Sequence, residues 1–182
     1  MTRDVYIMVG ISGAGKSTWV KNATSTLDKS TYRVICPDFE RKKLTGDISN
    51  QDKNDKVFSN CNWRLAKSVD NELVSKIYWD ATNLNTQSLK DIKKIVRKSK
   101  YTWSIHVVCF EDSRNWELCS SRVEKDIANG VDRSVTVGVI NEETGLPLIQ
   151  LMSQKYVNLV DGVLNDWCTR NNVEKIVVGE TA

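Results

Sequence analysis

The chain has 182 residues, with 26 Lys and Arg against 23 Asp and Glu, so two nearly balanced populations leave a net charge of only +3. That charge is ordinary for one domain, and it permits a nucleic-acid partner without requiring one. Hydrophobic residues make up 40% of the chain, which is enough for a core and excludes intrinsic disorder. We therefore expect a single folded domain over residues 1–182.

The sequence predicts neither a signal peptide nor a membrane span. No apolar run reaches the roughly 18 residues that a membrane helix needs, and charged residues stand close to the first methionine. The five cysteines form no Cys-x-x-Cys pair, and the chain has one histidine. This pattern indicates reduced thiols rather than a disulfide framework or a zinc site, so we expect a cytoplasmic protein.

Short runs of β-branched and aromatic residues alternate with longer amphipathic segments. The runs that predict strands are 5–9, 32–36, 77–79, 103–109 and 175–178. The segments that predict helices lie between them, at about 16–27, 50–75, 87–99, 113–128 and 145–169. This alternation predicts an α/β fold with a central, mostly parallel five-stranded sheet and helices on both faces. Ligands bind such sheets at the carboxyl ends of the strands.

The first predicted strand is followed by a loop that matches the pattern Gly-x-x-x-x-Gly-Lys-Ser. Glycines in this pattern let backbone N–H groups converge on phosphates, and the next helix presents its positive end. Lys16 can reach the β and γ phosphates, and the Ser17 hydroxyl can bind Mg²⁺. The sequence thus predicts a nucleoside triphosphate with Mg²⁺, bound by Gly10, Ser12, Gly13, Ala14, Gly15, Lys16, Ser17 and Thr18.

The loop alone does not separate GTPases, ATPases and small kinases. The chain lacks a strand of four apolar residues ending in Asp-Glu, which a motor or AAA-type ATPase carries, and it lacks Asn-Lys-x-Asp for guanine. The small size and the compact loop favour a kinase, in which the other strand ends recognise the acceptor.

Polar residues follow the second and third predicted strands. Asp38 and Arg41 form Asp-x-x-Arg, and Asp80-Ala81-Thr82-Asn83-Leu84-Asn85 forms the second block. With the loop and Trp19, these blocks resemble the polynucleotide 5′-hydroxyl kinase family, which includes the kinase domain of the phage T-even enzyme and relatives in RNA repair. The resemblance extends to about residue 160 and implies a P-loop kinase fold. The Asp-x-Asp-Gly-Thr motif of the phage enzyme's phosphatase domain has no counterpart here.

Phosphorylating a hydroxyl requires a carboxylate that orients the nucleophile and takes its proton. Asp38 lies just past a strand end, and Arg41 at i+3 lies on the same side of a helical turn. The resemblance implies that Asp38 is the base and that Arg41 holds the acceptor's 3′ phosphate. The alternative is an N-cap role for Asp38 with a solvated Arg41. Glu40 is expected at the surface.

The third strand end offers a second group of candidates. Asp80 could bind Mg²⁺ through water or pair with Arg41, and the resemblance favours the Arg41 pair. The alternative is a plain polar turn formed by Asp80, Thr82 and Asn83. We expect Thr82 and Asn83 near the substrate, without an assigned role.

Small P-loop kinases close an arginine-bearing lid after the fourth strand, and segment 111–139 is the expected lid. Family members that the chain resembles have two lid arginines close together, whereas Arg122 and Arg133 are eleven residues apart. We expect Arg133, which precedes the β-branched run 135–137, to be catalytic and Arg122 to contact a phosphate of the nucleotide. Arg114 is expected to be a solvated helix residue.

These residues together predict an ATP-dependent polynucleotide 5′-hydroxyl kinase that uses Mg²⁺ and acts on a 5′-OH end of DNA or RNA. One alternative is a related kinase for another hydroxyl, on a hydroxymethylated base in DNA, a mononucleotide or a small metabolite. Another is a nucleotide-binding switch without transfer activity. Asp38 and Arg41 speak against the switch, because a switch needs no acceptor base.

Overall fold

The structure is a computed structural model that describes residues 2–133 and 137–179. Within these residues five strands form one sheet of order β2-β3-β1-β4-β5, and every pairing in it is parallel. The strands are β1 (Asp4–Val9), β2 (Tyr32–Ile35), β3 (Lys76–Trp79), β4 (Ser104–Phe110) and β5 (Glu174–Val178). The expected fold class is confirmed, and no end of an expected strand is displaced by more than one residue.

The helices between the strands match the expected segments with three exceptions, the first being that the helix expected over 113–128 is divided into a 3₁₀ turn and an α-helix. The described residues form α1 (Lys16–Thr24), α2 (Pro37–Thr45), α3 (Asn54–Val69), α4 (Thr86–Val96), a 3₁₀ turn η1 (Glu111–Arg114), α5 (Trp116–Ala128), α6 (Leu148–Val157), a π-helical turn η2 (Asn158–Val163) and α7 (Leu164–Asn171). Helix α2 was not expected as a helix of its own. The single helix expected over 145–169 is instead α6, η2 and α7, and the π turn contains Gly162, a poor helix former.

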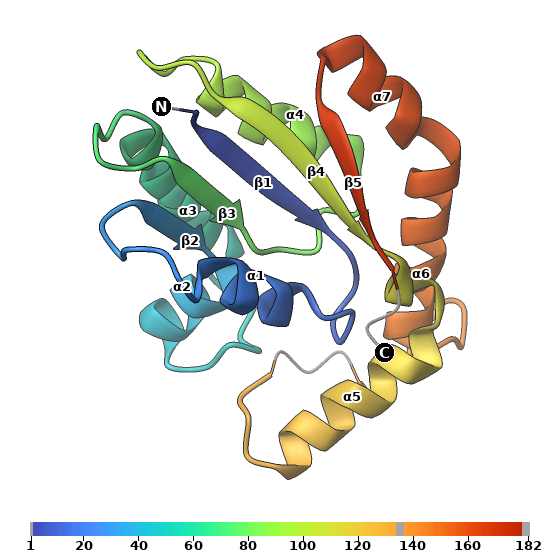
Figure 1. Cartoon of the computed structure of the whole chain (residues 1–182). Helices are drawn as coiled ribbons and strands as arrows, with labels where there is room; N and C mark the ends of the chain where they lie inside the picture. Colours follow the sequence, from blue (N-terminus) through green and yellow to red (C-terminus); the bar gives the residue numbers. More distant parts are fainter. Residues whose placement is uncertain (1, 134–136, 180–182) are drawn as a thin grey trace.

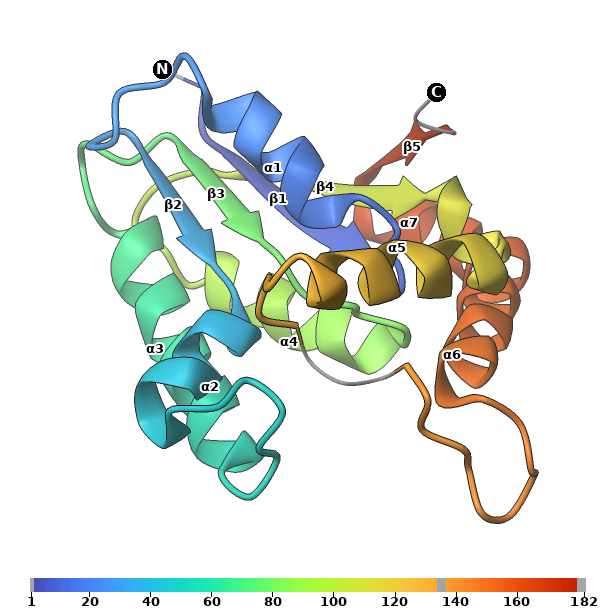
Figure 2. The same cartoon turned by 90° about the horizontal axis from the view of Figure 1, so that it is seen from below.

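The helices cover both faces of the sheet. Helix α1 lies on one face, and α3 and α4 lie on the other (Figure 1). Helix α5 crosses beside the carboxyl ends of the strands, where the chain leaves β1 for α1 (Figure 2). No helix in the described ranges is both long enough and apolar enough to cross a bilayer.

The centre of the core is β1, which pairs with β3 on one side and β4 on the other. Val5, Ile7, Met8 and Val9 of this strand are fully buried. The chain changes direction across the sheet at β1, because β3 and β2 lie on one side of it and β4 and β5 on the other. A ligand site is expected at the carboxyl end of such a strand, and the glycine-rich loop begins there.

Candidate active site

The glycine-rich loop joins the buried end of β1 to α1. Gly13 has a φ of 81°, and Gly15, immediately before α1, has a φ of 88°. A Cβ atom on Gly13 would lie only 2.2 Å from the backbone carbonyl oxygen of Cys119 in α5. The loop therefore packs directly against the backbone of the lid helix, and glycine is required at position 13 for space as well as for φ.

Two side chains at the end of the loop carry the polar groups expected to meet a nucleotide. Lys16 Nζ donates a hydrogen bond to the carbonyl oxygen of Ile11 at 2.7 Å. Burial lowers the pKa of Lys16 below its ordinary value of 10.5, and the carboxylates of Asp80 and Asp38 oppose that shift. Ser17 Oγ donates to Oδ2 of Asp80 at 2.8 Å, so the hydroxyl expected to bind Mg²⁺ already contacts a carboxylate.

Asp80 follows β3 directly and is buried. Its contact is with Ser17, whereas the guanidinium of Arg41 contacts other groups among the described residues. The Asp80–Arg41 pair that the resemblance favours is therefore not formed in this structure. The other expectation, that Asp80 binds Mg²⁺ through water, stays a prediction, and in this structure Asp80 contacts the hydroxyl that is expected to bind Mg²⁺.

The next residues after β3 hold the strand end against the loop. The backbone N–H of Gly10 donates to the carbonyl oxygen of Thr82 at 3.1 Å. Asn83 has a φ of 49°, and its Nδ2 donates to the carbonyl oxygen of Met8 at 2.7 Å. Thr82 and Asn83 thus shape the backbone of the site, and the Asn83 side chain is buried.

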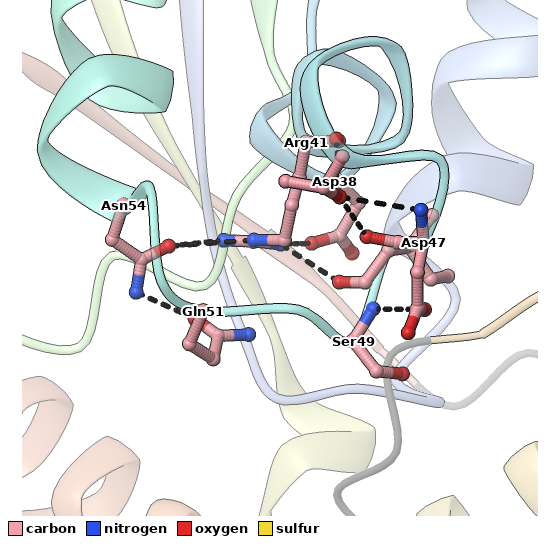
Figure 3. Close-up of polar contacts among 8 residues, drawn as sticks. Asp38, Arg41, Asp47, Ser49, Gln51 and Asn54 are labelled. Atoms are coloured by element: carbon pink, nitrogen blue, oxygen red, sulfur yellow. Dashed lines mark hydrogen bonds and ion pairs between the residues drawn. The ribbon is translucent and has the colours of Figure 1, made fainter.

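Helix α2 begins directly after β2 and joins the two expected acceptor residues. Its N-cap is Cys36 and its first residue is Pro37, so Asp38 stands inside the first turn. Arg41 Nη1 lies 2.5 Å from Asp38 Oδ1 (Figure 3). The Arg41 side chain is 6% exposed and the Asp38 side chain 53%. The alternative of an N-cap Asp38 with a solvated Arg41 is therefore wrong.

A polar pocket at the start of α3 holds the Arg41 guanidinium. Nε and Nη2 of Arg41 donate to Oδ1 of Asn54 at 3.3 and 2.9 Å. Nη1 also donates to the carbonyl oxygen of Ile48 at 3.3 Å. Asn54 is itself held, because its Nδ2 donates to Gln51 Oε1 at 2.6 Å (Figure 3). The guanidinium is therefore fixed between α2 and α3 before any acceptor arrives.

Glu40 corrects an expectation, because it is only 8% exposed instead of lying at the surface. Its carboxylate accepts from Asn60 Nδ2 and from Arg64 Nη1, both at 3.2 Å. A buried carboxylate requires such partners. The buried contacts of Glu40 thus hold α2 against α3, and α2 is the helix that carries Asp38.

Each expected lid arginine is paired with a carboxylate of the same segment. Arg122 Nη1 lies 2.5 Å from Asp112 Oδ2 and donates to the carbonyl oxygen of Gly13 at 3.3 Å. Arg133 Nε donates to Asp126 Oδ2 at 2.9 Å, and Nη2 contacts the same oxygen. Residues 134–136 lie outside the described residues, so most of the β-branched run after Arg133 does too.

Arg114 is exposed, as expected, but its guanidinium is held by two carboxylates. It lies in η1, and its Nη1 and Nη2 donate to the two carboxylate oxygens of Asp161 at 2.8 and 2.7 Å. A contact to Glu111 at 2.5 Å completes the network. These two acidic partners raise the pKa of Arg114 further above its ordinary value. Arg114 therefore ties η1 to η2 and is structural.

A single cleft of about 570 Å³ brings most of the expected site residues together. Its lining includes Ser12, Gly13, Ala14, Gly15, Lys16, Ser17, Thr18, Asp38, Arg41, Asp80, Thr82, Arg122 and Arg133. Two expected site residues, Gly10 and Asn83, are not part of the lining. The cleft has the volume of a small-molecule site and lies at the carboxyl ends of the strands, as predicted.

The donor groups in this cleft fit a nucleoside triphosphate with Mg²⁺. Positive φ at Gly13 and Gly15 gives the loop the backbone form that cradles phosphates, and Lys16 adds an ammonium. The Ser17 hydroxyl and the Asp80 carboxylate are oxygen donors, which Mg²⁺ prefers.

Three side chains that hold the site were not identified from the sequence. Asn54, Asp112 and Asp126 fix Arg41, Arg122 and Arg133, and no local motif marks any of them. Helix α2 does carry a local signal, because Pro37 at its first position and Gly46 with a φ of 80° after its last turn are start and stop residues.

Comparison with known proteins gives one family and several structural neighbours. A family described as an AAA domain matches residues 5–143. No curated protein sequence matches the chain. The matched segment nevertheless lacks the Asp-Glu pair of AAA-type ATPases, since Asp80 is followed by Ala81.

Three solved structures illustrate the likeness. A fungal RNA kinase superposes with a TM-score of 0.59 at 12% identity, covering 98% of this chain and 75% of that chain. A shikimate kinase from Acinetobacter baumannii, in complex with shikimate, gives 0.52 at 17% identity, covering 100% and 85%. A chain of a Pnkp1/Rnl/Hen1 complex gives 0.53 at 19% identity, covering 80% of this chain and 43% of that one, so this protein spans less than half its length. The fold is that of a P-loop kinase.

Proposed function

We propose that this chain, which belongs to the AAA domain family, is an ATP-dependent polynucleotide 5′-hydroxyl kinase that acts on a 5′-OH end of DNA or RNA. The observation that carries the proposal is the Asp38–Arg41 pair, which shares one cleft with Lys16. A carboxylate and a fixed guanidinium beside a phosphate-binding loop suit an acceptor that has both a hydroxyl and a phosphate.

Asp38 orients the acceptor hydroxyl and takes its proton. Its side chain is 53% exposed in the cleft, so a hydroxyl can reach the carboxylate directly. Helix α2 is held from inside by Glu40, and the position of Asp38 is therefore set before the acceptor binds. Such pre-orientation of a general base is part of its rate effect.

Arg41 holds the phosphate on the 3′ side of the reacting sugar. A guanidinium has five N–H donors. Four contacts to the described residues leave one N–H on Nη2 for a phosphate oxygen. A two-point contact requires Nη1 to leave Asp38 as well, and that exchange frees the carboxylate for the hydroxyl at the same moment.

The loop and β3 hold the phosphoryl donor. Bound Mg·ATP supplies the γ-phosphoryl group and the positive charge that its phosphates need during transfer. Lys16 and the loop N–H groups would bind the phosphates, the Ser17 hydroxyl would bind the metal, and Asp80 would act on the metal through water. Arg133 stabilises negative charge in the transition state, and Arg122 holds a phosphate beside Gly13.

Two structural neighbours support this choice of acceptor, since one is a fungal RNA kinase and another is a chain of a complex that contains Pnkp1. A second candidate is a kinase for the hydroxyl of a small metabolite. The shikimate kinase neighbour favours it, because that likeness covers the whole of this chain. The two candidates differ in whether the acceptor must carry a phosphate for Arg41.

Transfer of labelled γ-phosphate to a panel of acceptors tests the proposal. The panel contains a 5′-OH oligonucleotide, the same oligonucleotide with a blocked 5′ end, nucleoside monophosphates, duplex DNA with a hydroxymethylated base, and shikimate. We expect label on the 5′-OH oligonucleotide and none on its blocked form. Label on the blocked oligonucleotide, on the modified duplex alone or on shikimate alone would overturn the proposal. A Lys16→Ala variant controls for contaminating kinases.

A further inference from the structure

Phe58 is an aromatic side chain of α3 that lies in the active-site cleft with a large part of its surface open. It is 41% exposed and lines the cleft together with Asp38 and Arg41. Of the large apolar side chains found exposed in residues 2–133 and 137–179, Phe58 alone is part of this lining. An exposed aromatic ring beside the polar groups of Asp38 and Arg41 suits a ligand that has an apolar face.

The position of Phe58 is tied to that of Arg41 through Asn54. Asn54 Oδ1 accepts two hydrogen bonds from the Arg41 guanidinium. Phe58 follows Asn54 by four residues on α3, so it lies on the same side of the helix about 6 Å further along the axis. The Phe58 ring and the Asn54 amide that holds Arg41 are therefore one turn apart on α3, and Phe58 lines the same cleft as Arg41.

The other aromatic side chains of the cleft are used for packing. Trp19 makes edge contacts with the rings of Tyr6, Tyr78 and Phe110, with centroids 5.9 to 6.2 Å apart. Phe110 is itself only 2% exposed. Trp19 is only partly exposed and packs against three other rings, so Phe58 is the most open of the described aromatic side chains in the cleft.

We infer that Phe58 is a stacking platform for a nucleobase next to the phosphate that Arg41 holds. The inference rests on the proposed function, and it adds a base-binding subsite to it. An uncharged ring stacks on every base, because each base has a π-face. Phe58 therefore contributes acceptor affinity without sequence preference, and it favours polynucleotide ends over hydroxyl compounds that lack a base.

Steady-state kinetics with abasic acceptors tests the inference. Phe58→Ala is expected to raise the KM for a 5′-OH oligonucleotide by roughly 5- to 100-fold, with the KM for ATP unchanged, while Phe58→Trp keeps a low KM. Two abasic acceptors are tested, one without the base of the terminal nucleotide and one without the base of the second nucleotide. With one of the two, the KM for the acceptor should be the same for Phe58→Ala and for the unmutated protein. Phe39→Ala and Trp63→Ala serve as matched controls, because both rings are exposed, at 60% and 63%, and lie outside the cleft.

Fluorescence of 2-aminopurine in the terminal or the second position gives a readout independent of turnover. We expect quenching on binding to the unmutated protein and to Phe58→Trp, and recovery of the signal with Phe58→Ala. The inference would be overturned if Phe58→Ala and the unmutated protein had equal KM values for the intact oligonucleotide. It would also be overturned if Phe58→Ala raised the KM equally for the intact acceptor and both abasic acceptors. Neither result would affect the proposed function. Failure of the unmutated protein to phosphorylate any 5′-OH oligonucleotide would instead overturn the proposed function.

Discussion

Arg41 is almost fully buried, yet it reaches an exposed partner, because its Nη1 lies 2.5 Å from the carboxylate of Asp38 at the cleft surface (Figure 3). The two residues are one turn apart on α2. The guanidinium is anchored by Asn54 through Nε and Nη2, and Nη1 also donates to the carbonyl oxygen of Ile48. The pair therefore links a rigid pocket between two helices to the open cleft, and several expectations depend on it.

Arg41 should distinguish acceptors by their phosphate. We expect a nucleoside 3′-monophosphate to be phosphorylated with a kcat/KM on the order of 10- to 100-fold above that of the free nucleoside, the effect of a charge-assisted two-point contact. Arg41→Ala should erase most of that ratio and Arg41→Lys should restore only part, because an ammonium lacks the planar fork. Lys43→Ala, on the exposed side of α2, is the control. Equal use of both acceptors by the unmutated protein would contradict the clamp.

Asp38→Asn should separate binding from chemistry. The amide keeps the shape of the side chain but cannot take a proton, so kcat should fall by about 10² or more. ATP affinity, measured by calorimetric titration, should stay unchanged because Asp38 does not hold the donor. Asp55→Asn, an exposed carboxylate in the first turn of α3, is the control. Near-normal turnover of Asp38→Asn on every acceptor would remove Asp38 from the role of base.

Asp80→Asn should change the requirement for Mg²⁺. The carboxylate accepts a hydrogen bond from Ser17 Oγ at 2.8 Å, and loss of such a partner typically weakens metal binding about 10- to 100-fold. Kinase activity measured against Mg²⁺ at fixed ATP should therefore reach half-maximum at a correspondingly higher concentration. The exposed Asp91→Asn on α4 should leave the curve in place. An unshifted curve for Asp80→Asn would show that Asp80 only shapes the strand end.

The two lid arginines should affect different kinetic constants. Arg133→Ala removes charge stabilisation from the transition state, so its kcat should fall at least about 10²-fold. Arg122→Ala removes a contact beside Gly13 of the loop, so it should mainly raise the KM for ATP. Steady-state kinetics of both variants decides between the roles. The reverse assignment of effects would mean that the catalytic arginine is Arg122.

Cys36 should react slowly with alkylating reagents at neutral pH. Burial and the nearby Asp80 carboxylate raise the pKa of Cys36 to about 11, so the reactive thiolate is scarce until the pH is high. Its alkylation rate should rise about tenfold per pH unit from 8 to 10, whereas a free thiol with a pKa near 8.5 levels off in that range. Mass spectrometry of the Cys36 peptide gives the rate. Rapid labelling at pH 7 would be inconsistent with the raised pKa of Cys36.

The sheet and the loop could be predicted because their signals are local. Runs such as 103–109 are rich in β-branched and aromatic residues, and each expected run became a strand. The loop pattern fixes its own place between a strand and a helix. Asp38, Arg41 and Asp80 could be located because they follow strand ends, which meet at one edge of a parallel sheet.

The partners of these side chains could not be predicted, because they come from packing between distant segments. Glu40 reads as a surface residue, yet Arg64 of α3 pairs with it in the interior, and nothing near Arg41 in the sequence marks Asn54 as its partner. The pairing of Asp80 with Ser17 spans 63 residues of sequence. The break of segment 145–169 into three helical pieces has only Gly162, in the π-helical turn, as a local signal.

The contact between Gly13 and Cys119 also bears on how the chain can diverge. A side chain at position 13 would meet the carbonyl oxygen of Cys119, an atom that every amino acid possesses. No replacement at position 119 can therefore act as a second-site suppressor of a change at Gly13. Compensation would have to shift the whole path of α5, and with it Arg122 and Arg133. The loop and α5 are thus constrained together through one backbone atom. Because that atom does not depend on the side chain at position 119, the constraint produces no covariation between positions 13 and 119.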